Sequence, residues 1–581
     1  MTRDRIVRPL PLVERSPLAG ILWSFRREFA FVGLLSMVSN LLMLSPTLYM
    51  LQIFDRVLVS GSELTLLMVS LIIIFFFAVM AFADWVRARL LVRTGVRFDE
   101  TLNERVFEAG FRAELEQSGH NPVQAFADLT NVRQFLTGRG TIAFFDVPWT
   151  PLYIAVSFVL HPYLGWLSIL FVTNLVVLGI VGKRVSWKAS EAASNAEVAM
   201  NKYLFSKLRN SEVVEAMGML GSLRRRWAGR HRRLLRAQAK VQEVTDHTST
   251  LVKFVRRTQQ SLSLAAAAWL VIRGEISLGS MIAANLVVAR ASLPVETIVT
   301  LWSSILSTRA ALGRLGDLLV AHPAHAEGSR IEPPIGAIEL KGLVATAPNR
   351  VEPILKSLDK EFRAGQFTAI IGPSGSGKST LARALIGIWP YTKGQVLLDG
   401  HPLDSWQKAI LGSAIGYLPQ DVELFDGTIA ENISRFGSRD SGRVIEAAQR
   451  AGMHDMILRM PKGYDTPIGD AGSVLSAGQR QRIALARALY GDPRLVVLDE
   501  PNANLDEAGD MALSKAIEDL KARGRTVFVI THRMNVLALA DRVLLLNRGT
   551  VQADGSREAI FATLPRNEPP PSVGGLIPQP A

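Results

Sequence analysis

Long apolar runs without charged residues dominate the first 310 positions of the chain. Leu64–Ala83 is 20 residues long without a charge, and Tyr163–Gly182 is a second run of this kind. At about 1.5 Å per residue, 20 helical residues match the roughly 30 Å hydrocarbon core of a bilayer. Phe29–Phe54 and Thr141–Leu160 are more polar runs of similar length. The pattern predicts membrane-spanning helices at all four places.

Hydropathy alone does not decide whether two later apolar runs cross the membrane. Thr258–Ile272 is short and Ile276–Ala289 ends at Arg290, so each could equally be a buried helix of a soluble domain. Asp146, within Thr141–Leu160, and Arg290, just after Ile276–Ala289, fall inside or near predicted spans, where a charge is costly unless it is paired or faces a cavity. The two residues could line or gate a conduit and pair with each other, or they could lie at solvated helix ends.

The excess of basic residues indicates which kinds of partner the chain could bind. The chain has 65 Lys+Arg against 52 Asp+Glu, a net charge of +13, which suits either nucleic-acid binding or the cytoplasmic flanks of membrane helices. Within the arginine cluster Arg224–Arg236, Trp227 is the only Trp, Tyr or Phe that could stack on bases, so we expect no nucleic-acid partner. Placing both basic stretches in the cytoplasm also places the N-terminus there. Their basic residues are Arg87, Arg89, Arg93 and Arg97, then Lys183, Arg184, Arg224–Arg226, Arg230, Arg232, Arg233 and Arg236.

The lack of cysteine excludes disulfides, thiolate metal sites and cysteine nucleophiles. The first 28 residues contain six arginines and no long apolar core, so no secretory signal peptide is expected.

The pattern of apolar and polar residues changes near Ile331, which predicts a second domain. After Pro333-Pro334, short β-rich runs (FTAIIG, LVVLDE, TVFVIT, RVLLLN) alternate with helical ones, as in a buried parallel sheet. We predict a cytoplasmic segment at 1–28, a helical membrane domain at 29–310, a linker at 311–335, an α/β domain at 336–566 and a disordered tail at 567–581.

A glycine-rich loop follows the strand-like FTAII and precedes a helical run. In this setting backbone N–H groups at a helix N-terminus cradle phosphates, a lysine adds positive charge, and the Ser379 hydroxyl can ligate Mg²⁺. The predicted ATP-binding residues are Gly372, Pro373, Ser374, Gly375, Ser376, Gly377, Lys378, Ser379 and Thr380.

The strand-like LVVLDE ends in two carboxylates that complement this loop. Asp499 is predicted to lie near the Mg²⁺, and Glu500 to polarise the attacking water. The chemistry expected is ATP hydrolysis.

With these motifs in place, the C-terminal half resembles an ABC ATPase, whose further motifs occur in the family's order. LSAGQ resembles the signature, in which Ser476, Gly478 and Gln479 would contact nucleotide held by the opposite subunit. The resemblance implies that Gln420 contacts Mg²⁺ and the water. It also implies that Asp506 belongs to the D-loop and that His532 senses the γ-phosphate.

Three features of the sequence depart from the family pattern. Ala477 replaces a glycine in the signature, and Asn502-Ala503-Asn504 precedes Asp506. The adenine-stacking aromatic is missing from Val344–Arg350, where the Arg350 guanidinium could stack instead.

Spans that precede an ATPase on one chain resemble ABC exporters, with a six-span membrane domain and a P-loop nucleotide-binding domain. Tyr49–Leu66, Gly274–Val299 and the segment Pro419–Ile433 resemble the PrtD-like type I secretion permease/ATPases. The resemblance upgrades the two open runs to spans. It implies a homodimer in the bacterial inner membrane that exports an unfolded polypeptide with a periplasmic adaptor and an outer-membrane channel. An exporter of lipid or small hydrophobic molecules is the alternative.

Overall fold

Two structural units make up the chain in the computed structural model. One covers residues 1–114 and 119–324, and the other covers 115–118 and 325–581. The structure describes residues 17–116, 122–208, 211–323, 328–347, 352–469 and 472–563.

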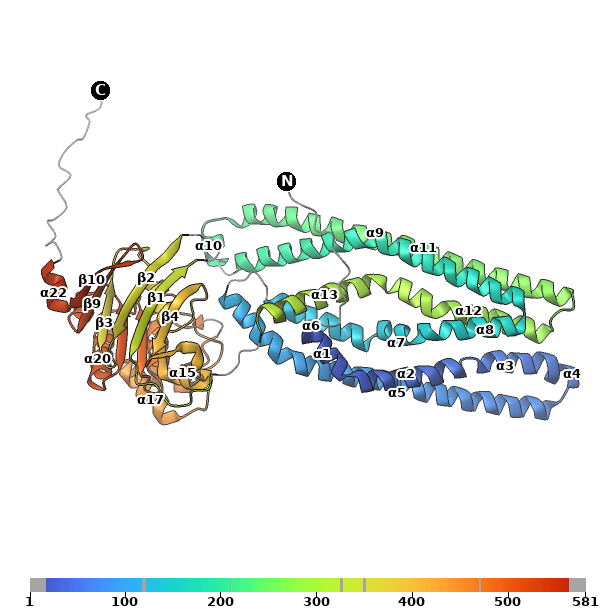
Figure 1. Ribbon diagram of the computed structural model, residues 1–581, viewed down its shortest axis with the longest axis horizontal. Helices are drawn as coiled ribbons and strands as arrows, with labels where there is room; N and C mark the ends of the chain where they lie inside the picture. Colours follow the sequence, from blue (N-terminus) through green and yellow to red (C-terminus); the bar gives the residue numbers. More distant parts are fainter. Residues whose placement is uncertain are drawn as a thin grey trace, which may run out of the picture. The chain divides into compact units, whose positions relative to one another are not determined.

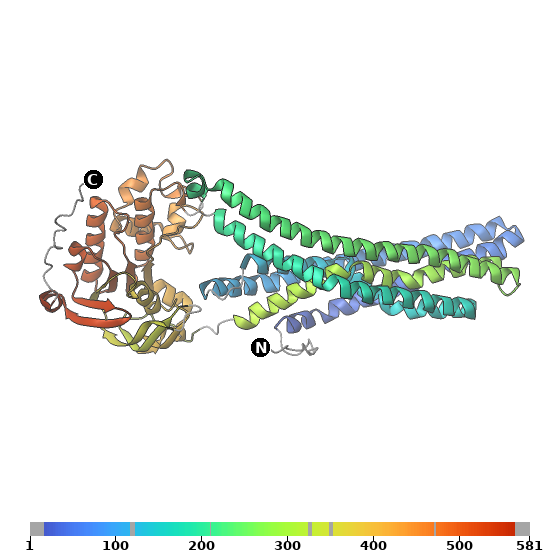
Figure 2. The same cartoon turned by 90° about the horizontal axis from the view of Figure 1, so that it is seen from above.

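The first unit is helical throughout the part that the structure describes. Its helices α9 and α11 run in opposite directions, and both views show them lying side by side (Figures 1 and 2). Pro148 and Pro151 divide the predicted span Thr141–Leu160 into α7, a 3₁₀ turn and α8. The helices are α1 (Pro17–Ser24), α2 (Arg26–Leu42), α3 (Ser45–Gln52), α4 (Leu58–Ser60), α5 (Glu63–Leu115), α6 (Pro122–Thr137), α7 (Arg139–Asp146), α8 (Thr150–Leu160), α9 (Pro162–Leu208), α10 (Ser211–Ala216), α11 (Leu220–Ile272), α12 (Leu278–Thr300) and α13 (Trp302–Ala321).

Within the described residues, five helical stretches are long and apolar enough to cross a membrane. They include the four runs predicted from hydropathy and the Ile276–Ala289 run. The remaining run, Thr258–Ile272, forms the end of α11, where Ala267 and Leu270 are buried. The five stretches are Arg26–Ser60, Glu63–Leu115, Gly140–Leu160, Pro162–Asn201 and Leu278–Thr300.

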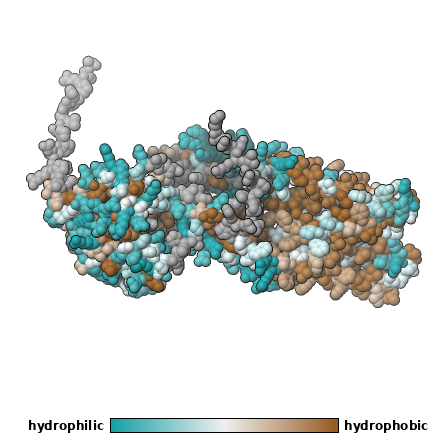
Figure 3. Space-filling model, in the orientation of Figure 1, coloured by the Kyte–Doolittle hydropathy of each residue, from teal (hydrophilic) through white to brown (hydrophobic). Residues whose placement is uncertain are grey.

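The surface of this unit carries a broad apolar band bounded by polar ends (Figure 3). Large side chains such as Phe75 and Trp166 are more than 60% exposed, at 63% and 66%. Soluble proteins rarely expose a continuous apolar surface of this extent. The band therefore indicates a membrane-spanning unit.

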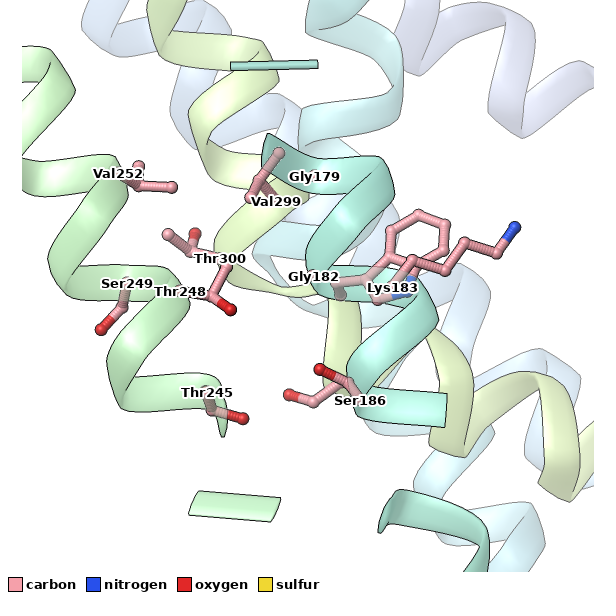
Figure 4. Close-up of a pocket in the computed structure, with 12 residues that line it drawn as sticks. Gly179, Gly182, Lys183, Ser186, Thr245, Thr248, Ser249, Val252, Val299 and Thr300 are labelled. Atoms are coloured by element: carbon pink, nitrogen blue, oxygen red, sulfur yellow. The ribbon is translucent and has the colours of Figure 1, made fainter. Parts of the chain in front are cut away.

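Small residues let the helices of this unit approach closely. A methyl group on Gly179 would lie 2.7 Å from a methyl of Val299, and one on Gly182 would lie 3.0 Å from Thr248. Both glycines line a crevice between α9, α11 and α12, into which Thr248 projects from α11 (Figure 4). Close backbone approach of this kind is typical of helices that pack within a bilayer.

Two of the predicted boundaries can be compared directly with the helices. His161 alone separates α8 from α9, as expected for a tight hairpin. Residues 311–321, expected in the linker, instead continue α13, where Ala311 and Leu315 are buried against α1 and α5 residues. The predicted tail, 567–581, lies outside the described residues.

The second unit contains the predicted parallel sheet. Its strand order is β10-β9-β3-β8-β7-β6, in which all neighbours are parallel except β10 and β9. The strands are β3 (Phe367–Ile371), β6 (Ile415–Leu418), β7 (Leu495–Asp499), β8 (Thr526–Ile530), β9 (Arg542–Asn547) and β10 (Thr550–Ser556). The runs FTAII, LVVLD, TVFVI and RVLLLN are strands, so this prediction is confirmed.

A second sheet covers one face of the first. It is antiparallel, in the order β2-β1-β4-β5, with β1 (Ile338–Thr346), β2 (Pro353–Phe362), β4 (Thr392–Leu398) and β5 (His401–Pro402). Phe362 of β2 and Phe528 of β8 meet edge to face at 4.9 Å. Every residue of β7 and β8 is buried, which explains their continuous apolar sequences.

Helices complete the second unit, with α16, α17, α18 and α19 packed together in one apolar core. The helices are α14 (Lys378–Leu385), α15 (Lys408–Ala414), α16 (Ile429–Ile433), α17 (Ser441–Arg450), α18 (His454–Leu458), α19 (Ala477–Leu489), α20 (Glu507–Ala522), α21 (Met534–Leu537) and α22 (Arg557–Thr563).

Candidate nucleotide-binding site

Four neighbouring strands place the predicted chemistry at one edge of the sheet. β3 leads into the glycine-rich loop, β7 ends at Asp499, β6 precedes Gln420, and β8 precedes His532. Because β3, β8, β7 and β6 are adjacent and parallel, their carboxyl ends meet at the same edge. Ligands of open α/β sheets bind at this edge.

Two glycines of the glycine-rich loop have positive φ angles and leave no room for a side chain. Gly377 has φ +103°, and a methyl group there would lie 2.9 Å from Leu355. A methyl group on Gly372, at φ +150°, would overlap the carbonyl oxygen of Leu546. The loop therefore requires glycine at both positions to form a phosphate cradle.

Lys378 begins α14 and points back over the loop. Its side chain is buried at 7% exposure, and its Nζ donates to the carbonyls of Gly372 at 2.8 Å and Pro373 at 3.0 Å. The buried Ser376 hydroxyl has no partner among the described residues. Both groups are thus held within the loop, where they could engage phosphate oxygens.

Asp499 is a buried carboxylate with unmet bonding capacity. Neither of its oxygens has a hydrogen-bond partner in the described structure. Burial raises the pKa of Asp499; the nearby Ser379 hydroxyl opposes this shift without reaching hydrogen-bond geometry, and Glu500 adds to it. A buried carboxylate beside a hydroxyl and a lysine is suited to holding a magnesium ion.

Glu500 follows Asp499 in a strained conformation, with φ +48°. Its amide donates to the Ile530 carbonyl at 3.0 Å, which ties the backbone to β8. Its carboxylate accepts a 3.1 Å hydrogen bond from Gln420. The structure thus brings together the two residues predicted to contact the attacking water.

His532 is exposed just beyond β8. Hydrogen bonds beside it account for Asn502, one of the residues that depart from the family pattern. The buried Asn502 accepts from the Thr531 hydroxyl at 3.3 Å and donates to Asp510 at 2.9 Å. Asn502 therefore connects the segment after Glu500 to the residue preceding His532.

The signature residues form the start of α19. Ser476 and Gln479 make a capping box, with the Gln479 amide donating to the Ser476 hydroxyl at 3.2 Å. A methyl group on Gly478 would lie 2.8 Å from the Asn504 carbonyl, so the D-loop segment packs against this position. Ala477 is exposed. No hydrogen bond or ion pair among the described residues joins Ser476–Gln479 to the glycine-rich loop.

Asp506 caps α20 and pairs with Arg482 of α19. The Gly509 amide, at 2.8 Å, and Arg482 hold the pKa of Asp506 below its usual range. The D-loop aspartate therefore links the start of α20 to the signature helix. Arg350, the proposed adenine contact, lies outside the described residues.

Comparison with known proteins decides the family. The chain is 42% identical over 550 residues to the type I secretion system ATP-binding protein PrsD of Rhizobium meliloti (strain 1021), covering 94% of both proteins. Residues 355–503 match the ABC transporter model, and residues 29–292 match the ABC transporter transmembrane region. The chain belongs to the type I secretion ABC exporters.

Other similarities agree with this assignment. The exporter is 28% identical over 544 residues to the cyclolysin secretion/processing ATP-binding protein CyaB of Bordetella pertussis, covering 91% of this chain and 75% of CyaB. Its fold resembles a bacterial Atm1-family ABC exporter with ATP bound, with a TM-score of 0.79 at 22% identity over 93% of this chain and 96% of that one. The predicted fold class is confirmed, and the chain is an ATP-hydrolysing membrane transporter.

The helical unit of the exporter contains a buried charge network that differs from the predicted pairing. Asp146 forms no ion pair with Arg290; it pairs with Arg87 at 3.0 Å. Arg87 also pairs with Asp84 at 3.0 Å and donates to Ser36. The sequence interpretation placed Arg87 in a cytoplasmic flank, but it is 8% exposed. Asp84, an acidic residue one helical turn before Arg87, could have indicated from the sequence that Arg87 is paired.

Sequence reasoning also missed Arg435 of the nucleotide-binding unit. Arg435 has φ +57°, and burial lowers its pKa. Its guanidinium donates to the Gly412 carbonyl at 2.6 Å and to three carbonyls around the end of α19, those of Arg487, Ala488 and Tyr490, at 3.0, 3.2 and 3.3 Å. Arg435 thereby fixes the end of the signature helix to the segment that follows α16.

Proposed function

We propose that the chain exports an unfolded polypeptide across the bacterial inner membrane as the ATP-driven subunit of a type I secretion system. The similarity to PrsD over 94% of both chains carries this proposal. The name of CyaB, a cyclolysin secretion protein, supports a protein cargo. A periplasmic adaptor and an outer-membrane channel would complete the export pathway.

The proposed mechanism places two ATP molecules between two copies of the chain. Each would be held by residues 372–380 of one subunit and by Ser476, Gly478 and Gln479 of the partner subunit. The capping box leaves the exposed start of α19 ordered for this contact. Asp506, held by Arg482 next to the signature, would belong to the same interface. Closure on ATP would rearrange the membrane helices, and hydrolysis would release them.

Within each site, we assign Mg²⁺ to Asp499, Ser379 and Gln420. Glu500 would orient and polarise the attacking water, and His532 would contact the γ-phosphate. The unpaired oxygens of Asp499 and the Gln420–Glu500 hydrogen bond support these roles. When bound, the ion would neutralise charge that develops on the phosphate oxygens.

The predicted six spans extend the five stretches found by length and composition. We propose that Thr258–Ile272 is the additional span, because its Ala267 and Leu270 pack with Leu164 and Ala284 of two spanning helices. The ATPase domain would then lie in the cytoplasm with the N-terminus.

A secretion experiment tests the proposed function. Strains of the host bacterium that carry either the natural chain or Glu500→Gln as their only copy are compared by mass spectrometry of the culture supernatant. Specific proteins should be lost from the supernatant and retained in the Glu500→Gln cells. An unchanged supernatant with altered membrane lipids would instead favour a lipid exporter.

A further inference from the structure

A cavity inside the helical unit contains one cation without a partner. The cavity has a volume of about 200 Å³ and lies between the α2–α3 region, α7, α8 and α12. Its polar lining consists of Asn40, Asp146, Tyr153, Arg290 and Thr297. At about 30 Å³ per water molecule, it can hold a carboxylate side chain with several waters.

All but one of these polar groups already have partners. Asp146 accepts from Arg87 at 3.0 Å and from Asn40 at 2.9 Å. Tyr153 donates to the Asn40 carbonyl at 2.9 Å, and Thr297 donates to the Leu293 carbonyl at 2.9 Å. Arg290 forms no hydrogen bond or ion pair within the described structure. Its guanidinium is the group with unused donors.

Asp146 is already engaged by a network that Arg87 shares between Asp146 and Asp84. Arg87, whose side chain is 10% exposed, bonds to the Asp146 oxygen that also accepts from Asn40. Asp146 is therefore committed to the contact between α5 and α7. Arg290, on α12, lines the same cavity, and its guanidinium has no hydrogen-bond or ion-pair partner among the described residues.

The backbone at Arg290 is also unusual. Pro294 lies four residues later inside α12 and cannot donate to the Arg290 carbonyl, so the helical ladder is interrupted there. Interrupted helices within membranes are tolerated where they face protein or a polar cavity. Pro294 itself lines the cavity, which places the interruption and the unpaired guanidinium at one location.

We propose that Arg290 is a transient binding position for carboxylate side chains of the exported polypeptide. The inference rests on the proposed function, because a polypeptide must pass the helical unit. A guanidinium fork matches a carboxylate with two parallel hydrogen bonds, and a charge inside a membrane protein usually marks a transport pathway. A single cation attracts acidic residues and still allows their release, as movement through a pathway requires.

The absence of cysteine from the chain provides a specific test. Thr297→Cys introduces one thiol into the half-buried cavity wall, and its reaction with anionic and cationic methanethiosulfonates of similar size is timed in detergent-purified protein. The anionic reagent should react faster, and Arg290→Gln should reduce its advantage by about threefold or more, because a nearby unit charge is removed.

Arg256→Gln is the matched control, because Arg256 pairs with Glu296, the residue preceding Thr297, at 3.4 Å. This change should leave the ratio of the two rates nearly unaltered. Next, a short Gly/Asp peptide should slow modification of Cys-substituted position 297, and a Gly/Asn peptide should not. The protection should be lost in Arg290→Gln.

Three results would overturn the proposal: an unreactive thiol, equal rates for the two reagents, or the same loss on Arg256→Gln. Retained ATPase activity of the Thr297→Cys protein shows that the chain is folded. Normal secretion in cells combined with any of these results would reject the binding position alone. Failed secretion combined with peptide protection would reject the proposed function and keep the site.

Discussion

The side-chain amide of Gln420 donates a 3.1 Å hydrogen bond to Oε2 of Glu500. The two residues are 80 positions apart and meet because β6 and β7 are neighbouring parallel strands. Glu500 is held there at φ +48°, a conformation that is costly for a non-glycine residue. Strain retained beside a carboxylate at the nucleotide edge of the sheet is consistent with a role in hydrolysis.

Replacing Glu500 by glutamine should separate ATP binding from ATP hydrolysis. We expect phosphate release to fall by about 10² or more, the usual contribution of a general base, while ATP affinity stays close to that of the natural chain. Phosphate release and equilibrium nucleotide binding are measured on the same preparation. Glu507→Gln, at an exposed position of α20, is the control. Sustained hydrolysis by Glu500→Gln would show that another residue activates the water.

Asp499→Asn should stabilise the protein in the absence of Mg²⁺ while removing hydrolysis. Burial raises the pKa of Asp499 above its usual 3.8, so the ionised form destabilises the fold when the pH exceeds that raised pKa. The advantage of asparagine should therefore be largest at neutral pH and shrink as the pH falls toward 3.8. Each kcal/mol regained should raise the melting temperature by roughly 2–4 °C.

Melting temperatures with and without Mg²⁺-ATP, taken at several pH values, test this expectation. Mg²⁺-ATP should stabilise the natural chain much more than Asp499→Asn. A lower melting temperature for Asp499→Asn without Mg²⁺ would mean that the carboxylate is structurally satisfied, contrary to its unpaired oxygens.

Arg87 and Asp146 should be coupled in stability. Losing a partner from a buried ion pair costs up to about 3–5 kcal/mol. The cost should be larger for Arg87, which serves both Asp146 and Asp84, than for Asp146, whose loss leaves Arg87 paired with Asp84. Arg87→Met and Asp146→Asn should each lower the detergent melting temperature, and the double variant should lose less than the sum of the two. Additive losses would contradict the pairing. Arg290→Gln combined with Asp146→Asn is the matched comparison and should be additive.

Arg435 should be needed for the signature helix and not for the phosphate loop. Its removal leaves four carbonyls without this donor, and Arg435→Lys cannot restore a planar fork, so both changes should destabilise the protein by about 2 kcal/mol or more.

At temperatures where Arg435→Lys remains folded, ATP binding through Lys378 should persist while kcat for hydrolysis falls. Titration of ATP binding and steady-state kinetics distinguish the two effects. Equal loss of binding and kcat would indicate general unfolding instead of a displaced α19.

Elements whose residues are close along the chain could be predicted from local sequence patterns. Residues 372–380 form one loop and the first turn of α14, LVVLD forms one strand that Glu500 follows, and LSAGQ begins one helix, so local pattern was sufficient for each. Buried parallel strands were equally predictable, because every residue of β7 and β8 is buried and their sequences are continuously apolar.

Which distant residues meet could be learned only from the folded structure. Asp146 pairs with Arg87 and not with Arg290, and Arg435 reaches carbonyls of α19 more than 50 positions away. Such contacts depend on how helices are rotated and offset against one another, and hydropathy carries no information about rotation. For the same reason the weakly apolar end of α11 was ambiguous in sequence, and its packing against α9 and α12 is what supports the proposal that it is a further span.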